Sequence, residues 1–575
     1  MDDSTRQRLI STGVMLVFVA AAVIAVEYFA PKHAADSSPS ASQTTHAQAG
    51  AAQTAHAQAD AAPQPTAPDS GASATSAESG PAAPAAPEQS VADAPTISLD
   101  TPTMHYVFST LNTGLVHAKV KGERFKDANG EPQEVVTTDQ AQYLPLVPEV
   151  QGVNIPAGAT WTARHDGPDA IVFTLETPTA TLTRRIEPGK AAYQLWSTLR
   201  VDNHTDAPLD ATLDYHLAHY VSKAAEKGPG IIGHRSPLMS HGICKFDDEL
   251  TRETEEGMLA PAKLGPDVHF VALSNVYFAT IIASDPEPAA RCDLWASHRG
   301  GTPDKPDGTL LEARLVYPSV TIPPRGEHVF KATTYVGPKR FEALQAFGHG
   351  ASEVVDLGWF SFIAKGLVEL LRFIHAYVPN WGIAIILLTV IVKAVLWPLT
   401  AKSFSSMAKM RDLKPEMDRI NELYADDREK KGAAIMELYR KNKINPLGGC
   451  LPSLLQTPIW FALYQSLSTN IELYHAPFAL WLTDLSAPDP YWVLPLLLGV
   501  LMFIQQVLTP VAADPLQAKM MKFGMPAMIT FFMLFLPAGL GLYMVTNSVL
   551  GIAQQKYIQV KMDHRAAATE NATLS

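Results

Sequence analysis

The chain has 575 residues, of which 47% are hydrophobic and 18% are charged, and its formal net charge is −12. This length allows several domains, and the negative charge argues against a protein that binds specific nucleic-acid sequences. Three cysteines without close spacing exclude the common zinc and redox motifs. Apolar stretches are distributed very unevenly, so their order along the chain is informative.

The first segment, residues 1–30, predicts a transmembrane anchor. Arg6 and Arg8 precede an apolar run over residues 9–30. That run is long enough for a spanning helix and longer than the apolar part of a secretory signal peptide. We therefore expect an uncleaved anchor with a cytoplasmic N-terminus. A cleaved signal, with its site at the KHAA sequence after the run, is the alternative.

Residues 31–95 predict a disordered tether. Ala, Pro, Ser, Gln and Thr dominate this segment, and no Lys or Arg occurs between Lys32 and Lys119. Such a composition offers too little apolar surface to fold. As a flexible coil, its roughly 60 residues would have an end-to-end distance of about 45 Å.

Residues 96–345 predict a soluble domain rich in β-strands. Apolar residues alternate in the sequences YQLWSTLRVDN and AIVFTLE, where Ile171, Phe173 and Leu175 share one face. Short strands separated by Pro and Gly favour a β-sandwich.

Two motifs in this domain favour structural roles. Gly228, Gly230 and Gly233 have the spacing of a dinucleotide-binding motif, but an intervening proline and the lack of a strand–turn–helix pattern favour a loop. His216 and His219 could be read as metal ligands. In a strand, however, a separation of three residues directs them to opposite faces, which favours structural histidines.

The cysteines of this domain leave two alternatives. If the domain is exported, Cys244 and Cys292 could form one disulfide, or they could be two buried thiols. Of these, we expect the thiols. The third cysteine, Cys450, lies in a later apolar run.

Residues 354–380 predict an amphipathic helix that lies in the membrane interface. Polar residues recur at helical spacing on one side, and apolar residues line the other. The polar set is Lys365, Glu369, Arg372 and His375, and the apolar set is Phe362, Ile363, Leu367, Leu370, Leu371 and Ile374. An additional membrane crossing here would move every later loop to the opposite side of the membrane.

Five apolar runs follow and, with the anchor, predict six membrane spans. They cover residues 381–400, 447–469, 491–509, 523–536 and 540–558. The loop over 401–445 carries eleven cations, whereas the loop over 471–490 carries no Lys or Arg. The positive-inside rule therefore places the first loop, both termini and the tail over 559–575 in the cytoplasm, and the β-rich domain on the other side.

The cytoplasmic loop predicts a helical hairpin. Apolar and aromatic residues at heptad-like spacing can pack across a turn at 425–427; they are Met410, Leu413, Met417, Ile420, Tyr424, Ile435, Leu438 and Tyr439. Pro415 suits the first turn of a helix. The hairpin is either a solvated pair of charged helices or a docking site.

Lys393 is the unusual residue of the first of these five runs. A charge at the centre of a span costs about 2.5–3.5 kcal/mol on insertion scales, and the five runs contain no Asp or Glu to neutralise it. The ammonium could snorkel to an interface about 10 Å away, or it could lie in a water-filled hollow. The runs offer uncharged polar partners, namely Thr389, Gln456, Gln465, Gln505, Gln506, Tyr543, Thr546, Asn547 and Gln554. Hydrogen bonding between helices is the ordinary use of such residues.

Five sequence motifs then occur in order: PNWGIAIILLTVIVKAVLWPLT, SMAKM, NPLGGCLPSLLQTPIWFALY, APFALWLTDLSAPDPYWVLP and FLPAGLGLYMVTNSV. In combination, they resemble the YidC/Oxa/Alb family of membrane protein insertases, in the Gram-negative form with a large periplasmic domain. The motifs cover about residues 381–555. The anchor and the 96–345 domain resemble the family more loosely.

The resemblance implies a polytopic α-helical protein of the bacterial inner membrane, in which five spans over 381–558 enclose a hydrophilic groove open to the cytoplasm. It implies that 96–345 is a periplasmic β-supersandwich. The groove cation, commonly arginine in the family, is Lys393 here, and the other groove positions correspond to Thr389, Gln456, Tyr543 and Met544. The positions along which substrates slide correspond to Cys450, Pro452 and Trp460.

The resemblance also implies nascent membrane proteins as substrates, without catalytic residues, metal or cofactor. It implies work in the lipid bilayer, alone or beside the SecYEG translocon and SecDF, with the ribosome and the signal recognition pathway as further partners. The tail over 559–575 lacks the strongly basic composition of some relatives. Two other classes remain open: a transporter or channel with Lys393 as its site, and an anchored carbohydrate-acting enzyme, for which no acid pair stands out.

Overall fold

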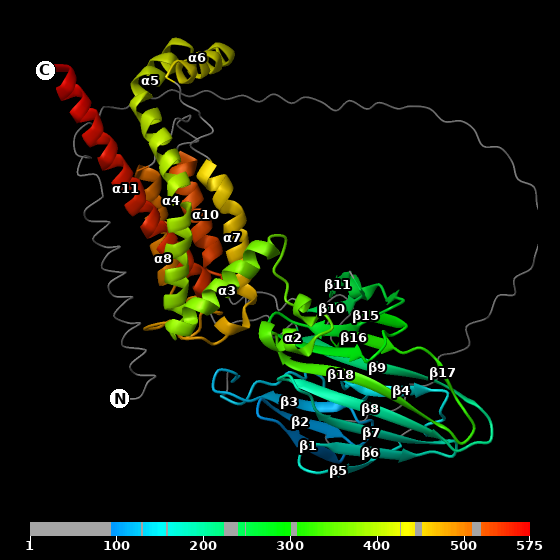
Figure 1. Ribbon diagram of the computed structural model, residues 1–575. Helices are drawn as coiled ribbons and strands as arrows, with labels where there is room; N and C mark the ends of the chain where they lie inside the picture. Colours follow the sequence, from blue (N-terminus) through cyan, green and yellow to red (C-terminus); the bar gives the residue numbers. More distant parts are fainter. Residues whose placement is uncertain are drawn as a thin grey trace, which may run out of the picture. The chain divides into compact units, whose positions relative to one another are not determined.

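The computed structural model describes residues 94–574, apart from gaps at 128–129, 157–158, 223–239, 248, 301–306, 426, 443–450 and 509–518 (Figure 1). The predicted anchor, nearly all of the predicted tether and the glycine motif at 228–233 lie outside the described residues. The described part consists of a β-rich region, residues 96–338, and helices from 341 onward.

Three antiparallel sheets form the β-rich region. The smallest contains β1 (Thr96–Asp100), β2 (Met104–Ser109) and β3 (Leu115–Val120). The nine-stranded sheet contains, in spatial order, β11 (Leu250–Thr254), β10 (His241–Lys245), β13 (Phe270–Ser274), β14 (Phe278–Ser284), β18 (Glu327–Pro338), β8 (Gln194–Asn203), β7 (Ala180–Pro188), β6 (Ile171–Glu176) and β5 (Thr162–His165). The six-stranded sheet contains β12 (Ala262–Leu264), β15 (Arg291–Arg299), β16 (Gly308–Val316), β9 (Leu209–Ser222) and β17 (Val320–Ile322), with β4 (Val147–Gln151) paired to β9.

The predicted alternation of apolar residues builds the core of this region. Leu195, Leu199 and Val201 of β8 are buried in the same cluster as Phe173 of β6. On β8 they alternate with residues that are partly or fully exposed, because successive side chains of a strand point to opposite faces. The prediction of a β-rich region is therefore confirmed.

The expectation of two free thiols is wrong. Cys244 on β10 and Cys292 on β15 form a disulfide, with their Cα atoms 6.2 Å apart. The two strands belong to different sheets, so the bond links the nine-stranded sheet to the six-stranded sheet. The residues are 48 positions apart in the chain, and only the packing of the two sheets brings them together.

The two histidines of the possible metal pair form hydrogen bonds within the β-rich region. His216 and His219 both lie on β9. The Nε2 atom of His216 is 3.2 Å from a carboxylate oxygen of Glu312, and Nδ1 of His219 is 3.1 Å from the hydroxyl of Thr137. Within the described residues, no group of three metal-ligating side chains comes together.

The amphipathic segment forms α3 (Ser361–Tyr377), after the short helix α2 (Phe341–Phe347). Ala364, Leu371 and Ile374 are its buried residues. Phe362, which was expected on the apolar face, is 89% exposed. It precedes Ala364 by two residues, or about 200° around a helix, so it lies on the opposite side.

The five apolar runs form helices that pack into one bundle around a shared core (Figure 1). They are α4 (Trp381–Asp412), α7 (Leu451–Thr469), α8 (Val493–Leu508), α10 (Met525–Met533), which follows a π-helical turn at Met520–Gly524, and α11 (Ala538–Leu574). The side chain of Asn380 caps α4 by accepting a hydrogen bond from the backbone of Ile383 (3.0 Å). Pro398 lies inside this helix, which continues beyond the apolar run to Asp412.

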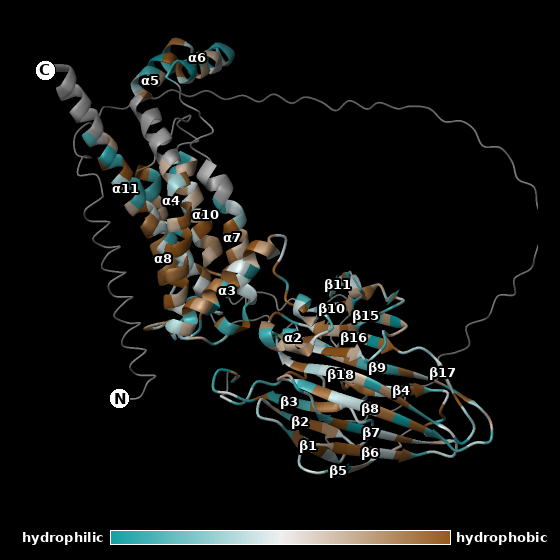
Figure 2. Cartoon of the chain, viewed as in Figure 1, coloured by the Kyte–Doolittle hydropathy of each residue, from teal (hydrophilic) through white to brown (hydrophobic). Residues whose placement is uncertain are grey.

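The loop after α4 contains α5 (Lys414–Leu423) and α6 (Arg428–Lys441). Met417, Leu438 and Tyr439 bury a small core between them. The side chain of Asp427 accepts a hydrogen bond from the backbone of Lys430 (3.1 Å) and caps α6. Figure 2 shows the contrast between this largely hydrophilic pair and the hydrophobic bundle helices α8 and α10.

Length and hydropathy single out one membrane-spanning candidate among the described helices, Trp381–Ala401. Val493–Leu508 and Met520–Met533 are apolar but shorter. The number of six spans is therefore not established by helix length, and the first of the six lies outside the described residues.

Candidate functional site

Lys393 lies in the middle of α4 and is half-buried in the bundle. Its Nζ atom lies 3.7 Å from the point at which a side chain on Gly551 of α11 would begin. The Nε2 atom of Gln505, on α8, lies 3.4 Å from the same point. The ammonium group therefore points between α8 and α11, which argues against snorkelling toward the end of α4.

One face of α11 carries several of the polar residues of the bundle. Tyr543, Asn547, Gly551 and Gln554 are separated by three or four positions, so they share one side of the helix. Gln456 of α7 donates a hydrogen bond from Nε2 to Oδ1 of Asn547 (2.9 Å). The Tyr543 hydroxyl also interacts with the Gln456 side chain. These contacts connect α7 to α11.

A second polar contact connects α4 to α11. The amide of Gln554 donates a hydrogen bond to the hydroxyl of Thr400 (2.5 Å), and both side chains are buried. The Thr400 hydroxyl in turn lies 3.0 Å from the carbonyl oxygen of Leu396. Uncharged polar groups therefore lie on α11 both before and after the level of Lys393.

The remaining predicted groove residues differ in their surroundings. Thr389 is only 1% exposed, and its hydroxyl donates to the carbonyl of Ile385 one turn earlier (2.7 Å). Its hydrogen-bonding capacity is thus used within α4. Met544 is partly buried and packs against the apolar core of the bundle. Gln465, also considered as a polar partner, donates to the carbonyl of Asp356 (3.0 Å) and does not join the cluster at Lys393.

The predicted sliding positions lie at α7 or just before it. Trp460 is half-buried and packs edge-on against Phe461 (4.9 Å between ring centroids) and in a stacked arrangement with Tyr464 (6.0 Å). Phe461 is 47% exposed, so this part of α7 presents aromatic surface. Cys450 lies outside the described residues, and only the backbone of Pro452, within α7, is described.

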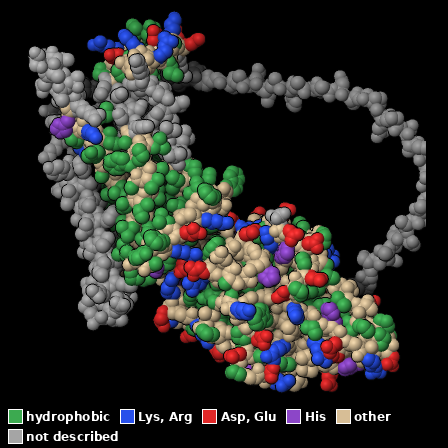
Figure 3. Space-filling view, in the orientation of Figure 1, with side chains coloured by type: hydrophobic (Ala, Val, Ile, Leu, Met, Phe, Trp, Pro, Cys, Tyr) green, Lys and Arg blue, Asp and Glu red, His purple; other side chains and the backbone are tan. Residues whose placement is uncertain are grey.

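The outside of the bundle is apolar. Figure 3 shows hydrophobic side chains over its visible face, whereas charged side chains gather on α5 and α6 and on the β-rich region. The exposed apolar residues of the bundle include Val395, Trp397, Leu496, Val500, Phe531 and Phe532. A surface of this composition is typical of contact with lipid.

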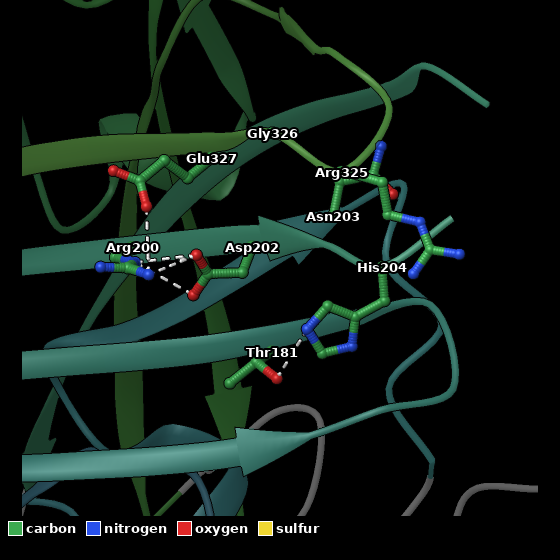
Figure 4. A pocket seen from close by; sticks show the side chains of 8 residues that line it. All are labelled: Thr181, Arg200, Asp202, Asn203, His204, Arg325, Gly326 and Glu327. Atoms are coloured by element: carbon green, nitrogen blue, oxygen red, sulfur yellow. Dashed lines mark hydrogen bonds and ion pairs between the residues drawn. The ribbon is translucent and has the colours of Figure 1, made fainter. Parts of the chain in front are cut away.

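The β-rich region has a shallow pocket of about 520 Å³ that does not resemble a catalytic site (Figure 4). Arg200 pairs there with Asp202 (2.7 Å) and with Glu327 (3.0 Å). Glycoside hydrolysis requires one protonated and one free carboxyl group, whereas both carboxylates here pair with the same guanidinium. The pocket does not support a carbohydrate-acting enzyme.

Gly551 is the residue of this site that sequence reasoning missed. A glycine inside an apolar run carries no polar signal by itself. Its position on the same helical face as Tyr543, Asn547 and Gln554 could have singled it out.

Comparisons with known proteins agree across nearly the whole described chain. The family model of the 60Kd inner membrane protein matches residues 373–565, and that of the YidC periplasmic domain matches residues 96–370. A protein of Citrifermentans bemidjiense named membrane protein insertase YidC is 35% identical over 480 residues, which cover 81% of this chain and 86% of the relative. A protein of Hahella chejuensis with the same name is 39% identical over 412 residues, 71% of this chain and 70% of the relative.

A crystal structure described as an active YidC insertase with its first transmembrane domain resolved also matches. It covers 81% of this chain and 93% of the matched chain, at 19% identity and a TM-score of 0.35. Because the identity and the TM-score are low, the family assignment rests on the sequence comparisons.

Proposed function

The chain belongs to the YidC family of membrane protein insertases, and we propose that the polar cluster around Lys393 is the site at which it receives its substrates. The protein is an insertase and not an enzyme. The observation that carries the proposal is the direction of Lys393, whose ammonium group lies near Gln505 and Gly551 within the bundle. A cation held there is suited to attract a passing carboxylate.

The proposed mechanism needs no covalent chemistry, nucleotide or cofactor. A short polar tail of the substrate enters a hydrophilic groove that is open to the cytoplasm, where Lys393 and the neighbouring amide and hydroxyl groups lower its desolvation cost. The following apolar segment leaves along α7 and α10 into lipid. Its burial releases about 25 cal/mol per Å² of apolar surface. Hydrophobic transfer therefore drives insertion, and the groove lowers the barrier.

We assign the remaining groove and sliding roles as proposals of the same kind. Gln456 and Tyr543 would present polar groups to the tail, with Thr389 and Met544 lining the wall. Trp460, with Cys450 and Pro452 earlier on the same path, would guide the apolar segment. The exposed ring of Phe461, which packs against the half-buried Trp460, supports this assignment.

The protein is an inner-membrane protein with a periplasmic domain. We propose that it crosses the membrane six times, through the anchor and the five bundle helices, with both termini in the cytoplasm. The eleven cations over 401–445 and their absence over 471–490 support this orientation. In this topology α3, with exposed aromatic residues such as Phe362, lies in the outer interface.

Nascent membrane proteins are the substrates that an insertase implies. We propose that the protein works alone or beside the SecYEG translocon and SecDF, and that α5 and α6 receive substrate from the ribosome or the signal recognition pathway. Over the whole loop 401–445, eleven Lys and Arg residues exceed eight Asp and Glu residues, and this excess supports docking to an anionic partner. A transporter or channel is not favoured, because the relatives are named insertases.

Site-specific photo-crosslinking to a stalled nascent membrane protein tests the proposal. Probes at Gln456 and Trp460 should capture the polar tail and the apolar segment, respectively. Leu496 on α8 is the control, because it is 58% exposed on the apolar outside of the bundle. Equal capture at Leu496 and Trp460, or no tail captured from Gln456, would contradict the proposed path.

A further inference from the structure

The segment between α7 and α8 contacts two different cores through successive residues. It begins with a 3-10 turn, Ile471–Leu473. Leu473 is 0% exposed and belongs to the apolar core of the bundle. Tyr474, the next residue, packs against the core of the β-rich region instead. The described residues of both regions belong to one compact unit, so this segment joins the helices to the sheets.

Two arginines hold the carboxylate of Glu472, the residue before Leu473. Arg124, which follows β3, donates from Nη2 to the backbone oxygen of Glu472 (2.6 Å), and its Nη1 lies 3.7 Å from one carboxylate oxygen. Arg340, which follows β18, donates from Nε to the other carboxylate oxygen (3.3 Å). The side chain of Glu472 is only 13% exposed. Hydrogen bonds between ionised groups of this kind are stronger than those between neutral groups.

The ring of Tyr474 packs against aromatic side chains of the β-rich region. The ring centroids of Tyr277, Phe278 and Phe125 lie 4.8, 5.8 and 6.4 Å from that of Tyr474. The Tyr474 hydroxyl donates to Oε1 of Gln133 (3.1 Å). Both the ring and its polar end are therefore held by the β-rich region.

These contacts also fix the C-terminal end of α7. Only two residues separate Thr469, the last residue of this helix, from Glu472. One of the two, Asn470, accepts a hydrogen bond from the backbone of Glu472 through its side chain (3.0 Å). In addition, the hydroxyl of Tyr277 donates to the carbonyl of Ser468, in the last turn of α7 (3.3 Å).

The chemistry of the contact favours a role in position. A buried carboxylate that is paired with cations adds little stability compared with apolar residues of similar size, whereas its geometry can select one arrangement of the parts that it joins. The two arginines lie in or next to the β-rich region, and the backbone of Glu472 continues from α7.

We propose that Glu472 and Tyr474 are positioning residues, through which the β-rich region holds the end of α7 and keeps Leu473 in the core of the bundle. The inference gives the β-rich region a role that is separate from the Lys393 cluster. It rests on the proposed function only in treating α7 as the path of the apolar segment.

The test measures how readily residue 473 leaves the core. A single reactive cysteine, Leu473→Cys, is introduced into the full chain in lipid vesicles, together with Cys450→Ser. The remaining two cysteines are bonded to each other. The rate of labelling by a membrane-impermeant maleimide, added on the side of the β-rich region, reports local opening.

Arg124→Met should raise this labelling rate about tenfold, the effect of losing a hydrogen bond to a charged group. Loss of a nearby cation by itself makes a thiol less reactive, so a higher rate reports exposure and not thiol chemistry. Arg124→Lys, which keeps the charge, should label more slowly than Arg124→Met.

Two controls separate position from general loosening. Arg325→Met removes an arginine of the β-rich region that pairs with Asp206 (2.9 Å), and it should leave the rate at Leu473→Cys unchanged. Leu494→Cys places the thiol at another buried position of the bundle core, and Arg124→Met should not raise its labelling. If Arg124→Met leaves the rate at Leu473→Cys unchanged, or raises the rates at both cysteines equally, the inference is refuted.

Photo-crosslinking from Trp460 separates this inference from the proposed function. In the Arg124→Met variant, capture of the apolar segment should fall, and unchanged capture would overturn the positioning role. If Trp460 captures no substrate in the unmodified protein, the proposed path along α7 fails, and the labelling rates still decide whether the β-rich region holds the end of that helix.

Discussion

Replacing Lys393 by Met removes the charge of the proposed groove while preserving most of the side-chain volume. The five apolar runs contain no Asp or Glu that would be left without a partner. The substitution also removes a cost of about 2.5–3.5 kcal/mol for holding a charge within a span. The bundle should therefore fold at least as well, and a loss of activity would report on substrate handling.

The size of the effect follows from the position of the ammonium group. A substrate carboxylate at roughly 4 Å from Nζ would interact with the ammonium group by about 4 kcal/mol at an effective dielectric constant of 20. Desolvation of the carboxylate offsets part of this, and hydrogen bonds to charged groups retain about 1.5–3 kcal/mol net. Insertion of an acidic tail should thus slow by roughly tenfold to a hundredfold.

The assay is insertion into vesicles that contain only the purified protein, with tails that carry Asp or Asn. Lys393→Arg should insert both tails at close to the normal rates, because the charge is kept. Val395→Met, on the same helix but 72% exposed, controls for the introduction of methionine. If Lys393→Met inserts the Asp tail as fast as the unmodified protein does, the reasoning about the charge is refuted.

Two further predictions concern the β-rich region and are measured by thermal unfolding of the full chain. Replacing Cys244 and Cys292 by Ser should lower its free energy of unfolding by about 4 kcal/mol, the chain-entropy value for a loop of this length; an unchanged midpoint would contradict a stabilising disulfide. Burial lowers the pKa of Lys339 from 10.5 to about 7, so the unfolded chain binds more protons between these pH values and the free energy of unfolding rises with pH across this window. Lys339→Met should therefore raise the thermal unfolding midpoint most at pH 7, and it should flatten the rise of the free energy of unfolding with pH. If the variant keeps the pH dependence of the unmodified protein, Lys339 does not cause that rise.

Local sequence patterns predicted the elements because their signals lie within a few positions of each other. The strand at residues 171–176 and the apolar runs of the bundle follow from alternation and from continuous hydrophobicity. The same reasoning failed for Phe362, which was placed on the apolar side of α3 although its own helical angle puts it on the exposed side.

The sequence by itself determined the family, the β-rich and helical parts, and the presence of an unneutralised lysine in an apolar run. Only the tertiary structure decided that Cys244 is bonded to Cys292, that the Thr389 hydroxyl is satisfied within its own helix, and that Lys393 faces Gly551. The physical reason is how far apart the interacting residues lie along the chain. Periodicity and charge reflect neighbours along the chain. The disulfide between the two sheets, and the approach of Lys393 and Gln505 to Gly551, depend on how distant segments pack.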